Sequence, residues 1–241
     1  RRDILDRVCS VKGVTGATPF IYTEVMLSGG GGVKGVVLRG IDPESAPAVL
    51  SMLRQMRSGS AANLEREGTP GLIIGEELAK RLGLGMGSRV NLLSPSGQKT
   101  TSGYAPRVRP FEVVGIFKTG MFEYDSSLGF VTLGASRDVL GLPENYLSGI
   151  ELTVDDVYKA DKISTLVSTE LGSPFYVRSW MEMNANLFAA LKLEKIGMFI
   201  LLAMVVLIGS FSIVTTLVML VMEKTRDIAI IMSMGATSGM I

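Results

Sequence analysis

The sequence predicts an α+β domain over residues 1–190, followed by one transmembrane α-helix and a short helix. The membrane helix is indicated by 27 consecutive uncharged residues, which run from Ile196 to Met222. As an α-helix this run spans roughly 40 Å, enough to cross a hydrocarbon core of about 30 Å. The mean hydropathy of the chain, +0.36, is also high for a water-soluble protein. The α+β domain is indicated by short Val- and Phe-rich segments that alternate with helical patterns.

Each element before the membrane helix follows from its apolar spacing and from the Gly, Pro or Asp residues that end it. Helices are expected at residues 1–11, 43–56, 76–82, 155–171 and 179–195. Strands are expected at residues 20–27, 34–41, 89–93, 111–117, 130–133 and 149–154, and residues 72–74 form a brief apolar stretch. The first two strands are joined by Ser28-Gly29-Gly30-Gly31-Gly32, a run that favours a flexible turn.

The order of these elements predicts two lobes. Residues 1–60 and 135–190 are expected to form an α/β lobe, and residues 61–134 are expected to form a strand-rich lobe inserted into it. The chain is expected to cross between the lobes at Gly68-Thr69-Pro70-Gly71, which is rich in turn-forming residues. A stalk and the transmembrane helix then occupy residues 191–222, and a further segment occupies residues 223–241.

The composition excludes most kinds of catalytic site. The chain contains no His and a single Cys, Cys9. Ser-His-Asp triads and HExxH zinc sites need His, and one Cys forms neither an intrachain disulfide nor a CxxC metal site. The net charge of +1 argues against a nucleic-acid partner, because neutralising phosphates requires an excess of basic residues. We therefore predict no catalytic residue, no metal ligand and no binding of nucleic acid.

Three short motifs that look functional are better explained by local structure. Gly30, Gly32 and Gly35 match GxGxxG, but they lead into a strand, whereas a dinucleotide site needs a following helix. The sequence has no Gly-Lys dipeptide and therefore no Walker A loop. The acidic pairs Glu76-Glu77 and Asp155-Asp156 lie at helix starts, which favour acids, and adjacent helical residues do not converge on one substrate bond.

Residues 95–110, PSGQKTTSGYAPRVRP, are the stretch that most favours a binding role. The stretch lies between two expected strands and carries Lys99, Arg107 and Arg109 without any acidic residue. Its prolines and glycines are expected to prevent it from extending a β-ladder. Its composition fits a mobile surface loop and a protruding arm equally well. As an arm, it would dock onto another protein by adding an edge strand and inserting Tyr104.

The segment after the apolar run begins with charged residues and continues with apolar ones. This pattern is typical of a short helix that lies at the membrane face or in the groove of a partner. Lys224 and Arg226 favour the cytoplasmic side, but Lys192 and Lys195 on the other flank balance them. Charge alone therefore leaves the orientation of the membrane helix open.

Several segments resemble a known group of transporters. EKTRDIAIIMSMGAT (223–237), placed after an apolar helix, resembles the coupling segment of the FtsX/MacB superfamily of ABC permeases. Within that superfamily, four segments resemble the lipoprotein-releasing permeases of the LolC/LolE family: GVVLRGIDPE (35–44), GLIIGEELAKRLGLGMGSRV (71–90), FEVVGIFKTGMFEYDSSLGFV (111–131) and LKLEKIGMFI (191–200). A full member of that family has four membrane helices, so the resemblance implies that the chain is an excerpt lacking the first, third and fourth.

The resemblance implies a non-catalytic permease subunit that extracts lipoproteins from the bacterial inner membrane and passes them to a periplasmic carrier chaperone. The α/β lobe then corresponds to the family's Porter-like part and the insertion to its Sabre-like part. Residues 1 to about 190 are expected to be periplasmic, and residues 223 onward cytoplasmic. The implied partners are two copies of an ABC ATPase that binds ATP and Mg²⁺, a second permease subunit, the carrier chaperone, lipoproteins and membrane lipid. No cofactor is expected in this chain.

Three groups of site residues follow from this resemblance. Carrier binding is expected at the hook-like loop 95–110, through Tyr104, Ala105, Pro106, Arg107, Val108 and Arg109. Contact with the ATPase is expected at Glu223, Lys224, Arg226, Ile228, Ile230, Ile231 and Gly235. The lipoprotein groove is expected to include Met198, Phe199, Leu202, Met204 and Val205. Unbranched Met adapts to varied acyl chains, but ordinary contact with lipid explains each of these five residues equally well.

Two other functions stay open. An FtsX-type scaffold regulates a cell-wall hydrolase and moves no substrate, but its extracellular domain is smaller and lacks the inserted lobe. A MacB-like exporter would carry its ATPase on the same polypeptide. Within the lipoprotein-releasing family, the LolC-type, LolE-type and merged roles are all open, as is the choice between a homodimer and a heterodimer of permeases.

Overall fold

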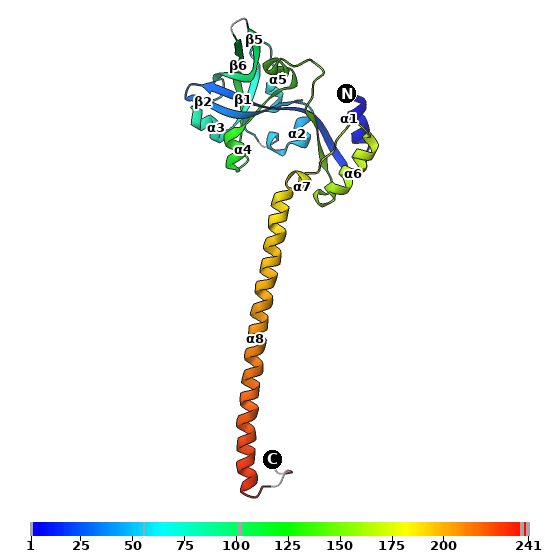
Figure 1. The fold of residues 1–241 in the computed structure, drawn as a ribbon. Coiled ribbons are helices and arrows are strands. Elements are labelled where there is room, and N and C mark those ends of the chain that lie inside the picture. The colour runs from blue at the N-terminus through cyan, green and yellow to red at the C-terminus, as the bar shows by residue number, and fades with distance from the viewer. Residues whose placement is uncertain (1, 55, 101–102, 237–238, 240–241) are drawn as a thin grey trace. The chain divides into compact units, whose positions relative to one another are not determined.

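The computed structural model of the chain describes residues 2–54, 56–100, 103–236 and 239, and describes the side chains of all of these except 2–3, 95–100 and 103–105. Two compact units are present, Arg1–Ser179 and Trp180–Ile241. Figure 1 shows the ribbon of both units with their elements labelled.

The first unit combines a mixed sheet with short helices. Its strands are β1 (Val14–Gly29), β2 (Gly32–Ile41), β3 (Met56–Gly59), β4 (Gly71–Gly75), β5 (Arg89–Thr100), β6 (Gly103–Phe117), β7 (Leu128–Thr132) and β8 (Gly149–Val154). Its α-helices are α1 (Arg2–Cys9), α2 (Ala46–Val49), α3 (Glu76–Leu82), α4 (Phe122–Ser127), α5 (Leu133–Leu140) and α6 (Ala160–Leu171). The 3₁₀ turns η1 (Ser51–Leu53), η2 (Ala61–Leu64) and η3 (Val157–Lys159) complete it.

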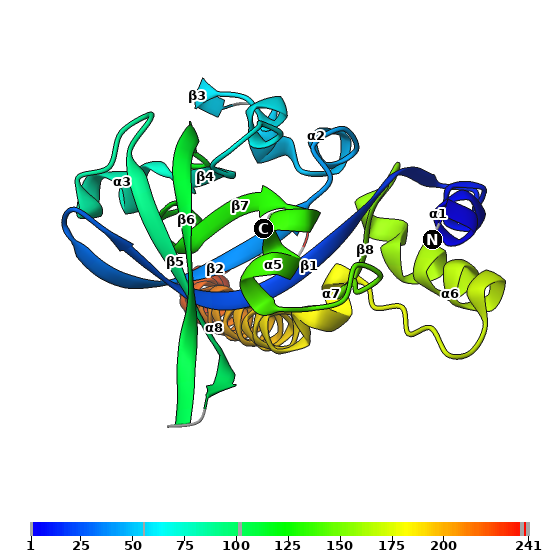
Figure 2. The same ribbon diagram turned by 90° about the horizontal axis from the view of Figure 1, so that it is seen from above.

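The sheet closes on itself. The strand order β2-β7-β4-β6-β5-β1 becomes a ring because β1 also pairs with β2. The pairs β2–β7 and β4–β6 are parallel, and the other pairs of the ring are antiparallel. β3 extends the sheet on β6, and β8 extends it on β1 (Figure 2). Closure leaves the ring strands with few free edges and surrounds a packed interior.

Two apolar clusters fill this unit on either side of the strands. Leu72 and Ile74 of β4 belong to one cluster, whereas Ile73 belongs to the other. Successive side chains of a strand point to opposite faces, so β4 is buried on both faces. In the second cluster the rings of Phe117 and Phe130 meet edge to face, with centroids 5.5 Å apart. These clusters hold the ring strands, α3 and α5 together.

A smaller third cluster lies at the β8 end of the sheet. It joins Val8 of α1 to Ile163 and Val167 of α6, and Leu152 of β8 packs against it. Figure 2 shows α1 and α6 side by side at this end of the unit. The long strand β1 connects this cluster to the ring, because its first half pairs with β8 and its second half with β2 and β5.

The ring takes β1 and β2 from the predicted α/β lobe and β4 to β7 from the predicted insertion. Residues 1–179 accordingly form one compact unit. The finer boundaries of the two lobes stay a prediction.

Comparison with the predicted elements shows where the local sequence pattern was sufficient to predict a helix or strand. Helix α3 and strand β8 have the predicted bounds. The predicted helix 43–56 is wrong, because only α2 and η1 form there and β3 begins at Met56. Leu50 is extended, with φ −96° and ψ 98°, and both Leu50 and Leu53 are buried in the second cluster. Burial of these leucines therefore outweighs continuation of the helix.

The glycine run forms a tight connection. Gly30 and Gly31 make the two-residue turn between β1 and β2, whose last pair is Gly29 with Gly32. The N–H of Gly31 donates to the carbonyl oxygen of Leu82, at 3.0 Å. A Cβ on Gly31 would lie 2.8 Å from the same oxygen, so only glycine fits this close approach to the end of α3. The turn was expected to be flexible, and it is instead anchored on α3.

The second unit consists of α7 (Trp180–Met183) and α8 (Ala185–Ser233). The rings of Trp180 and Phe188 pack edge to face, with centroids 5.2 Å apart. Helix α8 has 49 residues and is long and apolar enough to cross a membrane. The separate short helix predicted after residue 222 is wrong, because α8 continues unbroken to Ser233. No Gly or Pro lies between residues 210 and 234 to end it.

Candidate functional site

The predicted hook-like loop is a β-hairpin. The ladder between β5 and β6 runs from Arg89 opposite Glu112 to Thr100 opposite Gly103. Its outer part projects beyond the ring, as Figure 2 shows. Among the described residues, the outer part of each strand pairs only with the other strand of the hairpin, since β1 pairs with β5 at residues 91–93 alone.

The expectation that prolines and glycines would stop the ladder is wrong. The register shifts between Ser94 and Gln98, where four steps along β5 match two steps along β6. Pro95 lies in this bulge, and Pro106 lies opposite it, between the paired residues Ala105 and Arg107. Pro95 and Pro106 therefore fall where the ladder is interrupted, and pairing resumes on both sides. Pro110 is paired with Asn91 in the inner ladder.

The two arginines of the predicted site contact the body of the unit. Nε of Arg109 lies 2.9 Å from Oδ2 of Asp138, and its Nη2 lies 3.0 Å from Oδ1. The guanidinium of Arg107 lies against Gly141, which caps α5 in the left-handed conformation, with φ 68°. Asp138 and Gly141 were not predicted as site residues. The Gly-Leu-Pro signal of a helix end at 141–143 was available in the sequence, but the contact itself was not.

The other predicted hook residues differ in what the structure describes. Val108 is exposed, at 49% of its surface, and Pro106 is exposed as well. The backbones of Tyr104 and Ala105 are paired in the ladder, and their side chains lie outside the described residues.

The acidic pairs have structural roles, as predicted. Glu76 is buried at the start of α3, and its carboxylate faces Arg57, Lys80 and Lys118, with Lys118 Nζ 3.0 Å from Oε2. Glu77 is more exposed and pairs with Lys80 at 2.9 Å. Three cations around one buried carboxylate fix the junction of β3, α3 and β6.

Asp156 caps the turn η3 and shows a shifted pKa. Its carboxylate accepts hydrogen bonds from the N–H of Tyr158, at 3.0 Å, and from Lys159 Nζ, at 2.9 Å. The Lys159 ammonium, followed by the Tyr158 N–H, holds the pKa of Asp156 below its ordinary value. The same bond raises the pKa of Lys159. Both groups are at the surface, so this is a local cap.

Within the described part of the chain, no group of three or more Cys, Asp or Glu side chains is placed to hold a metal ion. Cys9 is exposed and is a free cysteine. The described side chains thus offer a projecting hairpin and a long apolar helix as candidate sites of function.

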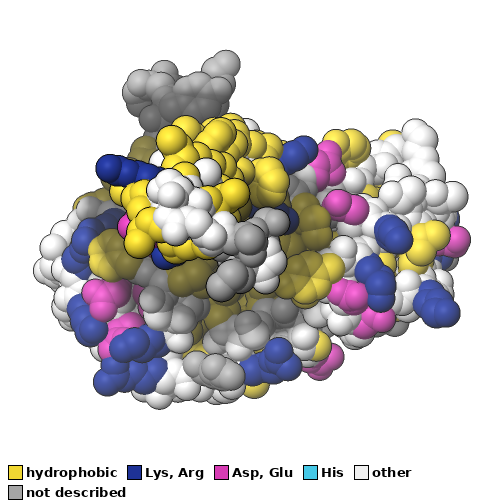
Figure 3. All heavy atoms as spheres, turned by 90° about the horizontal axis from the view of Figure 1, so that it is seen from below, with side chains coloured by type: hydrophobic (Ala, Val, Ile, Leu, Met, Phe, Trp, Pro, Cys, Tyr) yellow, Lys and Arg dark blue, Asp and Glu magenta, His cyan; other side chains and the backbone are white. Residues whose placement is uncertain are grey.

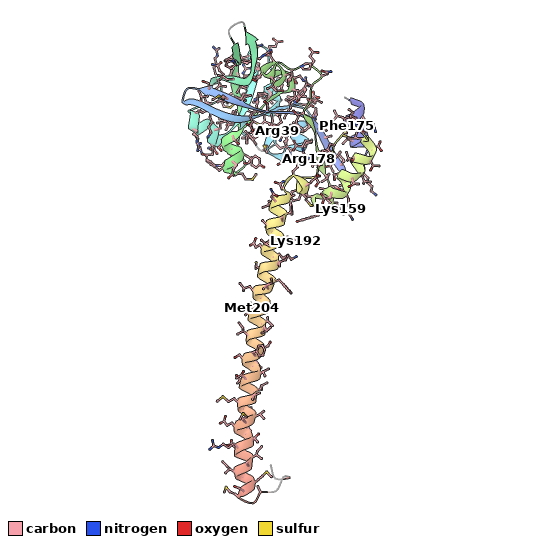
Figure 4. All side chains as sticks on the ribbon, in the orientation of Figure 1. Arg39, Lys159, Phe175, Arg178, Lys192 and Met204 are labelled. Atoms are coloured by element: carbon pink, nitrogen blue, oxygen red, sulfur yellow. The ribbon has the colours of Figure 1, made fainter. Side chains whose placement is uncertain are left out.

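Helix α8 carries the other two predicted groups. The predicted groove residues are exposed on it, and Figure 4 shows Met204 and, nearer its start, Lys192 projecting from the helix. Figure 3 shows hydrophobic side chains over most of its visible surface. The hydroxyls of Ser210, Thr215 and Thr216 donate to carbonyl oxygens one turn earlier, at 2.8–2.9 Å. These bonds satisfy polar groups that lipid could not.

The predicted coupling residues lie on the last turns of α8 and just beyond it. Glu223, Lys224, Arg226, Ile228, Ile230 and Ile231 are helical. Gly235 follows the helix with φ 101°. Lys224 Nζ lies 3.6 Å from Asp227, a weak exposed pair. The hook, groove and coupling residues therefore form three separate groups on the hairpin and on two parts of α8.

Comparison with known proteins identifies relatives of both units. The chain is 34% identical over 238 residues to the lipoprotein-releasing system transmembrane protein LolC of Neisseria meningitidis, covering 97% of this chain and 56% of that protein. It is 33% identical over 222 residues to LolC of Xylella fastidiosa, covering 92% and 53%. It is 25% identical over 229 residues to LolE of Haemophilus influenzae, covering 95% and 54%. The chain thus spans about half the length of these relatives.

A family model for the MacB-like periplasmic core domain matches residues 2–169. This match covers the ring, the hairpin and the small cluster of α1 and α6. The predicted resemblance to LolC and LolE is confirmed by the relatives, and the chain belongs to the family of MacB-like periplasmic core domains.

Proposed function

We propose that this chain is part of a permease subunit of an ABC transporter that releases lipoproteins from the bacterial inner membrane. The observation that carries the proposal is the extent of the alignment with LolC, which includes 97% of the chain and therefore α8 as well as the sheet. The core-domain match alone ends at residue 169 and would fit an FtsX-type scaffold or a MacB-like exporter equally well.

In this proposal α8 crosses the inner membrane. The unit that precedes it is periplasmic, up to about residue 190, and residues from Glu223 onward are cytoplasmic. Lys192 and Lys195 then flank the span on the periplasmic side, and Lys224 and Arg226 flank it on the cytoplasmic side. Flanking cations of this kind suit the headgroup regions at both ends.

The hairpin would be the arm that recruits the periplasmic carrier chaperone. In the described part of its outer strands, one edge of each strand has no partner strand, and such edges accept a further strand. Tyr104 and Ala105, near the outer end of the ladder, would add contacts with the carrier. A two-stranded projection reaches a soluble partner without moving the core.

The apolar run of α8 would guide the acyl chains of the cargo. Exposing an acyl chain to water costs about 0.8 kcal/mol per CH₂, so the cargo must pass between apolar surfaces. Met198, Phe199, Leu202, Met204 and Val205 lie in the first half of the apolar run and are exposed on α8. Met198, Phe199, Leu202 and Val205 share one side of the helix and would form one wall of a groove, with a second permease subunit forming the other. Met204 lies on the opposite side of the helix.

The end of α8 would contact one of two ATPase subunits, which bind ATP and Mg²⁺. Because α8 is continuous to Ser233, movement of Ile228, Ile230 or Ile231 in an ATPase groove would be transmitted along a rigid helix into the membrane. This chain would thus carry motion and would not itself hydrolyse ATP.

Transfer of a lipoprotein tests the proposal directly. The full-length permease containing this chain would be reconstituted with its ATPase and second permease in liposomes that hold a fluorescent lipoprotein. We expect ATP-dependent appearance of the lipoprotein on added carrier chaperone. ATP-dependent activation of a cell-wall hydrolase without transfer would favour the FtsX-type scaffold, and export of peptide without transfer would favour the MacB-like exporter.

The arm is tested by carrier binding to the same complex. Tyr104→Ala should weaken binding by about tenfold or more, the effect of removing an aromatic anchor. Tyr22→Ala is the matched control, because Tyr22 is an exposed tyrosine on β1, outside the hairpin. Equal binding by both variants would contradict the role of the hairpin tip.

A further inference from the structure

The hairpin needs a support where it leaves the ring. Beyond Leu93 its ladder no longer includes β1, and the bulge after Ser94 interrupts pairing inside the hairpin itself. A two-stranded ribbon is only marginally stable alone, and a bulge allows a strand to bend. Without a further contact, the outer hairpin would be free to swing about this point.

Side chains alternate between the two faces of β6, and this alternation shows which residues supply the contact. Phe111 and Val113 are buried in the same cluster as Val139 of α5. Side chains two residues apart share a face of a strand, so Arg109 and Arg107 continue this row outward along the hairpin. They therefore emerge on the side where α5 packs, and Figure 1 shows α5 beside the base of the hairpin.

The contact has two parts. Asp138 of α5 receives Arg109 in a bidentate pair, with N–O separations of 2.9 and 3.0 Å. The pair is half exposed, at 47% and 59%, and a single exposed pair contributes little to stability. Its two parallel bonds nevertheless fix the direction of the guanidinium.

Arg107 supplies the second part. A Cβ built on Gly141 would lie 2.5 Å from Cζ of Arg107 and 2.7 Å from each terminal nitrogen. The planar guanidinium therefore fills the space that the missing side chain leaves at the end of α5. The C-terminal end of a helix also attracts cations. The two contacts lie on successive residues of one face, so together they resist rotation of the hairpin.

We infer that Asp138 and Gly141 are positioning residues, which set the direction of the hairpin by holding Arg109 and Arg107. This inference rests on the proposed function for its biological meaning, because a fixed direction matters for an arm that must meet a carrier. Arg107 and Arg109 then affect carrier binding by setting the orientation of the hairpin. An arm that is already held in its binding orientation loses less conformational entropy when it binds.

The orientation of the hairpin is measured by the distribution of distances between two spin labels. Thr100→Cys at the tip and Met86→Cys on the body would be labelled in a Cys9→Ser background of the full chain. Asp138→Ala should broaden the distance distribution, and the exchange Asp138→Arg with Arg109→Asp should narrow it again. Asp156→Ala, which breaks an exposed pair elsewhere, should leave it unchanged. Unchanged distributions in Asp138→Ala would overturn the inference.

A second pair of variants separates the effect of losing the Arg107–Gly141 contact from the effect of backbone strain. Gly141→Ala places a methyl group where Arg107 lies, at a left-handed helix end. Gly83→Ala imposes the same strain at the end of α3, where φ is 62° and nothing lies within 4 Å of the added Cβ. Gly141→Ala should broaden the distribution, and Gly83→Ala should not. Equal effects of the two variants would overturn the role assigned to Gly141.

Carrier binding by the same samples keeps this inference distinct from the proposed function. Asp138→Ala should weaken binding by about three- to tenfold, with recovery in the charge exchange. Broadened distributions with unchanged binding would uphold the positioning role and contradict the hairpin as the carrier arm. Unchanged distributions with weakened binding would overturn positioning and leave the arm in place.

Discussion

Arg39 of β2 and Glu151 of β8 form an ion pair across β1. Figure 4 labels Arg39 within the sheet, and its guanidinium lies 5.2 Å from the centre of the Phe20 ring on β1. The residues are neighbours because Phe20 pairs with β2 on one edge and with β8 on the other. The Arg39 side chain is only 16% exposed. This pair therefore connects the closed ring to the strand that carries the α1–α6 cluster.

Removing this pair should loosen the β8 end of the sheet. We expect Arg39→Ala to lower the free energy of unfolding of the first unit by about 2–3 kcal/mol, because it leaves a half-buried carboxylate and uncovers Phe20. Hydrogen exchange of the full chain in detergent would show faster exchange in β8, α1 and α6 than in β4. Uniform protection across all four elements would contradict this connection.

Glu76 and Glu77 provide a matched comparison on one helix. Glu76→Ala should lower the free energy of unfolding by about 2 kcal/mol, because it leaves three cations facing one another around a buried site. Glu77→Ala should change it by less than about 1 kcal/mol, as for other exposed pairs. Thermal unfolding of the two variants measures the difference, and equal losses would refute the structural role of Glu76.

Asp156 should titrate below the usual range of aspartate. Because its pKa is lowered in the folded state, the cap contributes stability above the pKa of the unfolded chain and loses it as pH falls through the lower folded pKa. NMR titration of the side-chain carboxyl carbons would locate the transition. Lys159→Ala should raise the pKa, since the Lys159 bond is its main cause. The idea fails if the variant titrates like the wild type.

Ile228 tests the coupling between ATP hydrolysis and release. Ile228→Asp should abolish ATP-dependent lipoprotein release by the reconstituted transporter, because it would place a charge in the apolar ATPase groove that we propose for this residue. Ile228→Val should retain most release, since it keeps an apolar side chain of similar shape.

Carrier binding by the Ile228→Asp complex would show that the first unit remains folded. Wild-type release by this variant would contradict coupling through Ile228.

The local sequence pattern was sufficient to predict an element wherever the residues within that element determine its structure. The part of α8 up to Met222 is predicted by an uncharged run long enough to span lipid, and α3 by acids at its start and Gly83 at its end. The structural role of Glu76 was also inferred from its place at a helix start. In contrast, the predicted helix 43–56 fails because burial of Leu50 and Leu53 depends on strands elsewhere in the chain.

The sequence by itself determined a folded α+β unit before one long apolar helix, and the family resemblance carried by its motifs. Only the tertiary structure decided that the sheet closes into a ring, that residues 95–110 form a hairpin, and that its arginines are held by α5. Arg109 and Asp138 are 29 positions apart, and Arg39 and Glu151 are 112 apart. Such contacts depend on strand register and on the order of strands in the ring, which no local spacing of residues specifies.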